Sequence, residues 1–340
     1  MKRKAIHNAS ATRALAGRSC TTLVTLAVVV AFALVLNGCG RGSNPAAAPP
    51  AQLPPLEFAN AWGTRGTEPG QLDAPVGVAT DSLGRVYIVD AGQTSVEKFT
   101  ASGGPLLSFG DAWLEKAAGI AVDRGGGIYV PEGNRVQIFW PEGDRLHVTY
   151  GGLVGAAGVA ADSDGTYYVT DRVACRVAAF DERGRMLRTW GKRGTGDGEF
   201  VGPTGVAIGP DGFVYVADSG GARVQKFSRD GVWVSSIGQA DANAAGGDGQ
   251  NAIGLAVSAR DIFLVGGTGA SLRIFTIDGQ PVSVDPEALA AAEASAPVSG
   301  AASAQNPAEL RAVSVTIDPG GDLLLLDAAS DRVLRFHLHL

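Results

Sequence analysis

Short apolar runs separated by glycine-rich turns recur along most of this chain, and the same order of runs appears six times. Each copy begins with an apolar run such as GVAT, followed in most copies by a turn rich in aspartate and glycine. A β-branched and aromatic run such as VYIVD comes next, then a loop and a third run that ends in phenylalanine. In most copies a second glycine turn leads to a fourth run, closed by an aromatic residue or isoleucine followed by glycine. Runs of this length and composition predict β-strands, four to each copy.

The copies can be aligned with one another. Residues 75–99 and 203–227 align without a gap and agree at 12 of 25 positions. Residues 118–139 and 157–180 share the same skeleton, and residues 253–275 and 313–336 share it more weakly. A period of roughly 40 residues with four strands per repeat is typical of a propeller blade. The sequence therefore predicts an all-β, six-bladed β-propeller with four antiparallel strands in each blade.

The sixth copy indicates how the ring closes. It stops at Leu340, directly after its third run, and has no fourth. At the other end, residues 56–63 (LEFANAWG) look like a fourth run without the preceding three. We expect this N-terminal strand to complete the last blade and to remove open sheet edges, which otherwise invite aggregation.

The first 38 residues have a different composition. They carry five basic residues and no acidic one, with an uncharged, mostly apolar run over residues 21–36. This layout is that of a secretory signal, and the run is short for a membrane span. It ends in LNGC (36–39), which resembles the lipobox of bacterial lipoproteins, so Cys39 is the expected lipid attachment site. An uncleaved membrane anchor or a non-lipidated secretory signal is the alternative.

Two further expectations follow from the lipobox resemblance. Gly40 follows the cysteine where inner-membrane lipoproteins often carry aspartate, which favours the outer membrane. Residues 39–55, rich in proline and alanine, are expected to tether the folded part to the membrane.

Charge and cysteine content exclude some functions. The chain has 28 basic and 34 acidic residues, and removing the five leader cations leaves 23 against 34, a net charge of −11. Nucleic acid is therefore not an expected partner, because its phosphates would be repelled. Cys175 is the one cysteine left after Cys39, so no intramolecular disulfide is expected in the mature chain.

Residues 217–227 (ADSGGARVQKF) are the clearest example of a known motif. They resemble NHL repeats, and the resemblance extends over residues 56–340. It implies six four-stranded blades closing a ring. Related six-bladed lyases use a histidine-ligated zinc or a catalytic histidine. Here the histidines after the leader are His147, His337 and His339, none of which matches such a residue. We therefore expect no catalytic residue, no metal site and no cofactor.

Most repeats carry an acid at the end of the second run and an arginine opening the third. The pairs are Glu132/Arg135, Asp171/Arg176, Asp218/Arg223 and Asp327/Arg332. Adjacent strand ends bring these opposite charges within reach. Four copies around a ring indicate an architectural role, since a catalytic centre would be unique.

The departures from this pattern are the candidates for function. Asp90 lacks an arginine partner, because Ser95 stands in that position, and the fifth repeat has Gly266 and Ser271 in place of the pair. Two similar loops, 63–75 and 191–203, place Arg65 and Arg193 at matching positions. Asp90, Arg65 and Arg193 are therefore possible partner-binding residues, although ordinary loop roles would also account for them.

An alanine-rich insertion spans residues 283–310, of which 286–294 could form a short helix. Propeller topology places it on the face of the loops between second and third strands, as a lid or as a tolerated excursion. Together these features predict a monomeric, lipid-anchored, extracytoplasmic binding platform for a protein, a peptide or a cell-envelope glycan. The alternative function is a lyase or hydrolase with a divalent metal in the central channel.

Overall fold

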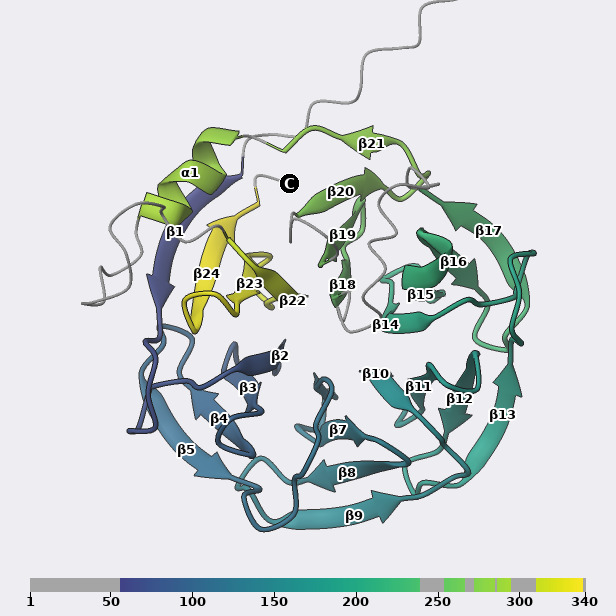
Figure 1. The fold of residues 1–340 in the computed structure, drawn as a ribbon, viewed down its shortest axis with the longest axis horizontal. Coiled ribbons are helices and arrows are strands. Elements are labelled where there is room, and N and C mark those ends of the chain that lie inside the picture. Colours follow the sequence, from purple (N-terminus) through teal and green to yellow (C-terminus); the bar gives the residue numbers. More distant parts are fainter. Residues whose placement is uncertain (1–55, 239–253, 267–271, 285, 295–309, 339–340) are drawn as a thin grey trace, which may run out of the picture. The chain divides into compact units, whose positions relative to one another are not determined.

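A computed structural model describes residues 56–238, 254–266, 272–284, 286–294 and 310–338. Within these residues, six four-stranded antiparallel sheets form the blades of a ring (Figure 1). The predicted fold class is therefore confirmed. The leader, Cys39 and the tether fall outside the described residues, as do Ser271 and His339.

Each of the first five blades consists of four consecutive strands, numbered from the channel outwards. Blade one holds β2 (Pro75–Thr80), β3 (Val86–Asp90), β4 (Ser95–Phe99) and β5 (Pro105–Phe109). Blade two holds β6 (Ala121–Val122), β7 (Ile128–Glu132), β8 (Arg135–Phe139) and β9 (Arg145–Thr149), and blade three holds β10 (Ala156–Ala161), β11 (Tyr167–Asp171), β12 (Arg176–Phe180) and β13 (Met186–Trp190). Blade four holds β14 (Pro203–Ile208), β15 (Val214–Asp218), the 3-10 turn η1 (Ser219–Gly221), β16 (Arg223–Phe227) and β17 (Trp233–Ile237), and blade five holds β18 (Gly254–Val257), β19 (Asp261–Val265), β20 (Arg273–Thr276) and β21 (Pro281–Val282).

The sixth blade joins the two ends of the folded ring, as the sequence predicts. Its order is β1 (Glu57–Trp62), β24 (Arg332–His337), β23 (Leu323–Asp327) and β22 (Ala312–Ile317). β1 runs antiparallel to β24, with Phe58 opposite Phe336 and Trp62 opposite Val333. The Trp62 ring also lies 4.7 Å from that of Phe99 in blade one, so this strand links two blades.

The core consists of six layers, each between two neighbouring blades. Second strands are buried along their whole length because both of their faces are covered. In β3, for example, Tyr87 and Val89 pack toward blade two, whereas Val86 and Ile88 pack toward blade six. Alternating side chains of one strand thus hold the blade to both neighbours.

The first strands approach one another closely around the axis. A Cβ atom built on Gly158 of β10 would overlap the carbonyl oxygen of Thr204 in β14. Glycine at this position therefore permits the spacing between blades three and four.

The predicted helix in the insertion is present as α1 (Pro286–Ala294). It lies beside β1 at the outer rim of the sixth blade (Figure 1). Ala288 and Ala292 are buried in the same core cluster as Leu56. The described part of the insertion thus covers the outermost strand of the closing blade, an accepted way of protecting a sheet edge. The rest of the insertion, residues 295–309, falls outside the described residues.

Two sets of connections define the two faces of the ring. We call loop face the side with the loops between second and third strands and the connections between blades. The tight turns between first and second and between third and fourth strands form the opposite face. No described helix is long and apolar enough to cross a membrane.

Candidate binding face and channel

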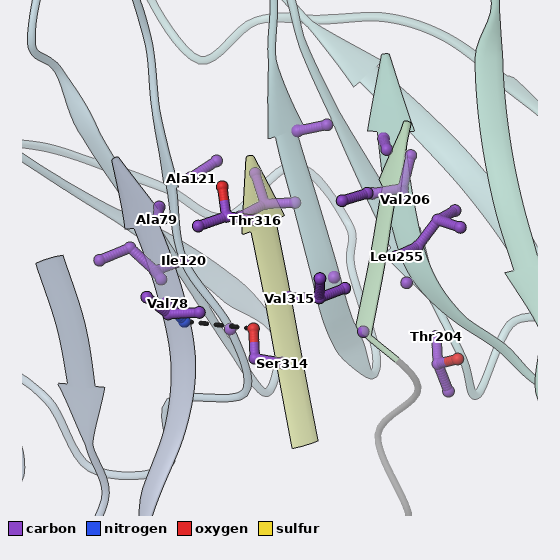
Figure 2. Close-up of a pocket in the computed structure, with 18 of the residues that line it drawn as sticks. Val78, Ala79, Ile120, Ala121, Thr204, Val206, Leu255, Ser314, Val315 and Thr316 are labelled. Carbon is purple, nitrogen blue, oxygen red and sulfur yellow. Dashed lines mark hydrogen bonds between the residues drawn. The ribbon is translucent and has the colours of Figure 1, made fainter. Parts of the chain in front are cut away.

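The first strands enclose an axial channel of about 500 Å³. Its walls are mainly valine, alanine, leucine and isoleucine side chains, including Val78, Ile120, Val206 and Leu255 (Figure 2). Ser314 accepts a hydrogen bond of 3.1 Å from the backbone N–H of Val78, which ties blade six to blade one (Figure 2). Among the described residues of the lining, Arg172 alone carries a charge, and none is an acid or a histidine.

All four predicted ion pairs are present on the loop face. The nitrogen–oxygen distances are 3.0 Å for Arg135–Glu132, 3.4 Å for Arg176–Asp171, 3.5 Å for Arg223–Asp218 and 3.0 Å for Arg332–Asp327. The four carboxylates are buried. A buried charge is stable only with a counterion and hydrogen bonds, and these groups have both.

The strand-end acids also hold the connections between blades. Asp218 accepts backbone N–H bonds from Val201 and Gly202, which immediately precede β14. Asp171 holds Val154 and Gly155 in the same way. Each acid therefore fastens the connection that enters its own blade, which sequence reasoning did not foresee.

The pKa of Glu132 is lowered from its usual value. Burial works against this direction, but hydrogen bonds from Arg135 and from the backbone N–H groups of Glu115 and Lys116 favour the charged form more strongly. The carboxylate is thus held ionised by the loop it anchors.

Asp90, the acid without an arginine, is buried rather than presented to solvent. It accepts backbone N–H bonds from Asp73 (2.6 Å), Gly92 and Gln93, and a side-chain bond from Gln93 Nε2. Burial raises the pKa of Asp90 despite these bonds. The structure thus places this candidate as a loop anchor, like the paired acids.

Arg65 and Arg193 occupy matching places in two loops of the same construction, as predicted. Arg65 is bridged to Leu72 and Arg193 to Phe200, and both of these apolar residues are fully buried. The side chains differ in their surroundings. Arg65, with 70% of its side chain exposed, bonds Asp331 at 2.5 Å, whereas Arg193 is exposed on the surface. Among these candidates, Arg193 alone has an exposed side chain that forms no ion pair with the residues that the structure describes.

One sector of the loop face carries an apolar patch that sequence reasoning missed. The patch consists of Trp113, Tyr150, Val154 and Val173, exposed by 38%, 60%, 59% and 59%. The other described loops of this face carry no exposed large hydrophobic residue. The sequence does show one contrast: the loop DRVACR at residues 171–176 carries Val173, where the matching loop DSGGAR at residues 218–223 carries glycine.

The patch is continuous from blade two to blade three. Arg135 donates to the carbonyl oxygen of Trp113 (3.3 Å). The pKa of Arg135 is raised mainly by its bond to Glu132, and the nearby Tyr150 side chain contributes in the same direction. Leu153 N–H then donates to Tyr150 O, and a Cβ on Gly155 would overlap the side chain of Val173. The connecting backbone is thus fixed by the same ion-pair framework.

The described histidines do not form a metal centre. His337 lies 2.8 Å from the Asp322 carboxylate, and this hydrogen bond raises its pKa. His147 lies in the outer strand β9. No group of three or more metal-ligating side chains occurs among the residues that the structure covers.

Comparison with known proteins agrees with this architecture. The NHL repeat model matches residues 200–227. A streptogramin B lyase structure is similar over 81% of this chain and 96% of its own, with a TM-score of 0.56 and 11% identity. A protein of unknown function from Bacteroides thetaiotaomicron is similar over 83% of this chain and 75% of its own, with a TM-score of 0.58 and 16% identity. A catalytically inactive virginiamycin B lyase from Staphylococcus aureus, solved with quinupristin, is similar over 81% of this chain and 83% of its own. Its TM-score is 0.53 and its sequence identity is 12%. No curated protein sequence matches the chain.

These structural similarities are at low sequence identity and concern the fold alone. The six closed blades make the chain a six-bladed β-propeller. The match to the NHL repeat model, over residues 200–227, covers three of the four strands of its fourth blade.

Proposed function

We propose that this propeller is a non-catalytic binding platform of the bacterial cell envelope, lipid-anchored through Cys39. It recognises a protein partner through the loop face, at the patch of Trp113, Tyr150, Val154 and Val173. The patch is the observation that carries the proposal. Aromatic residues and arginine are enriched at the energetic centres of protein interfaces, and Arg135 lies next to Trp113, to whose carbonyl oxygen it donates.

The loops around the patch are already ordered. Asp171 binds the connection that carries Val154, and Arg176 binds both Asp171 and the carbonyl oxygen of Gly152. Binding on such a surface costs little loop ordering. A peptide or glycan would also bind loops, but the apolar character of the patch favours a protein surface.

The alternative of a metal-dependent lyase or hydrolase finds no ligands in the described channel. Divalent cations in proteins are commonly held by carboxylates, and zinc also by histidine. The described residues of the lining include neither. No observation therefore favours this second function.

Site-specific photo-crosslinking in intact cells tests the proposed face. A photoreactive amino acid replaces Val173 in the patch, and in a matched control it replaces Leu83, which is 72% exposed in a turn of the opposite face. We expect a discrete adduct with the probe at 173, absent with the probe at 83 and removed by Val154→Asp. Equal adducts at both positions, or an adduct that survives Val154→Asp, would contradict the proposal.

Anchoring is tested separately. Metabolic labelling with an alkyne fatty acid should label the wild-type chain and fail with Cys39→Ala, which should also leave the membrane fraction. A Cys39→Ala chain that keeps label and membrane association would disprove lipidation at this residue.

A further inference from the structure

Arg172 breaks the repeat pattern at a position where every other blade has a small residue. It directly follows the acid that ends the second strand of blade three. The residues at the same place in the other blades are Ala91, Gly133, Ser219, Gly267 and Ala328. A large cation replaces a small residue only here, so blade architecture does not require it.

The Arg172 side chain is not used by the framework of ion pairs. The neighbouring Asp171 is already occupied by Arg176 and by the backbone N–H groups of Val154 and Gly155. Among the described residues, Arg172 forms no ion pair, and it contributes a backbone N–H bond of 2.8 Å to Gly155 O. Its side chain is partly buried and lines the axial channel. A cation beside apolar walls is favourable when an anion meets it there.

The rest of the channel suits an alkyl chain. Its volume of about 500 Å³ lies in the range of small-molecule sites. Aliphatic side chains of all six first strands form its wall, and the described polar side chains besides Arg172 are the hydroxyls of Thr80, Thr204, Ser314 and Thr316. Thr204 lies at the second position of β14, near the loop-face end that also carries Arg172.

We propose that the axial channel binds a small amphiphilic carboxylate, such as a medium-chain fatty acid. Its carboxylate pairs with the Arg172 guanidinium at the loop-face mouth, and its alkyl chain fills the aliphatic lumen. Arginine binds carboxylates through two parallel N–H bonds, which orients the head group. An alkyl chain needs no hydrogen-bond partner, whereas a peptide would require one for each amide that it buries. This site is distinct from the patch, so either proposal can fail alone.

Calorimetric titration of the full-length chain with dodecanoate, below its micellar concentration, tests the proposal. Dodecan-1-ol and dodecyltrimethylammonium serve as uncharged and cationic probes. We expect one dodecanoate per chain, with the alcohol bound about tenfold more weakly and the cation more weakly still. Arg172→Ala should weaken dodecanoate binding about tenfold and leave alcohol binding unchanged, whereas Arg172→Lys should retain much of the affinity.

Arg193→Ala is the matched control, since it removes an exposed arginine from the same face and should leave binding unchanged. Octanoate and hexadecanoate test the channel itself, because affinity should rise with chain length until the lumen is filled. Equal binding of dodecanoate by wild type and Arg172→Ala would overturn the proposal, as would equal affinity for the acid and the alcohol. Tighter binding of an apolar peptide with a free C-terminal carboxylate than of any fatty acid would overturn it in favour of a peptide ligand.

Discussion

The side-chain amide of Gln93 donates a hydrogen bond of 2.8 Å to the carboxylate of Asp90, taking over a task that arginine performs in four other blades. Ser95, which pairs with Asp90 in the strand register, instead donates to Glu97 at 2.7 Å. A neutral amide satisfies a lone pair but supplies no positive charge. Blade one therefore buries a carboxylate whose charge is balanced by hydrogen bonds alone.

Replacing the strand-end acid should therefore cost less in blade one than in blade four. Asp218→Asn leaves Arg223 without its counterion, and we expect a loss of about 3 kcal/mol in the free energy of unfolding. Asp90→Asn leaves no buried cation without a counterion, so we expect a loss of about 1 to 2 kcal/mol in the free energy of unfolding. Urea unfolding at pH 7 measures both. An equal loss for the two variants would mean that the ion pair with Arg223 stabilises the fold no more than the hydrogen bond from Gln93 does.

The two kinds of acid should also respond to pH in opposite directions. The pKa of Asp90 is raised, so the folded state holds its proton more tightly than the unfolded state. As the pH falls through the range between the folded and the unfolded pKa of Asp90, the wild type gains stability relative to Asp90→Asn. The pKa of Glu132 is lowered, so its contribution is present above the unfolded value and lost as pH falls through the folded one. The difference in the free energy of unfolding between wild type and Glu132→Gln should therefore shrink as the pH falls.

Unfolding free energies of wild type and both variants between pH 7 and pH 3.5 give the two differences directly. The difference between wild type and Asp90→Asn should grow toward low pH, and that for Glu132→Gln should shrink. Differences that change in the same direction would contradict the assignment of at least one pKa shift.

The sequence predicted the blades, the closure and the ion pairs because each depends on residues at fixed positions within a repeat. Asp218 and Arg223 occupy facing positions of a hairpin, so strand register alone brings them together. The surroundings of Asp90 could not be predicted in this way. Gln93 lies in the loop rather than at the arginine position, and Asp73 approaches from the connection between blades. The patch likewise assembles from separate connections. The sequence alone shows that Arg172 replaces a small residue of the repeat, but its place in the channel comes from the structure.

Arg65 and Arg193 provide a matched pair for separating ring closure from surface chemistry. The two residues occupy equivalent loops, but only Arg65 is bonded to the buried Asp331, 266 positions away in sequence. Asp331 also accepts the backbone N–H of Ala74. Arg65→Ala should therefore lower the free energy of unfolding, by an amount limited by the solvent exposure of Arg65, whereas Arg193→Ala should leave it unchanged. If Arg65→Ala is as stable as the wild type, Arg65 does not contribute to ring closure, and its side chain in the wild type is available to a partner.

The closing strand gives the strongest test of the ring. Deleting residues 56–62 removes β1, which leaves β24 as an open edge and uncovers Phe336 and Phe99, the ring partners of Phe58 and Trp62. Because Trp62 also touches blade one, the loss reaches both sides of the seam. We expect the melting temperature to fall by about 10 °C or more, with concentration-dependent aggregation through the new edge. Deleting residues 46–52 instead shortens the chain by the same length, keeps β1 and should not change melting. A synthetic peptide of residues 54–64 added to the shortened chain should restore part of the lost stability, since it can pair with β24. Unchanged melting after removal of β1 would show that five complete blades and a three-stranded sixth hold the ring without it.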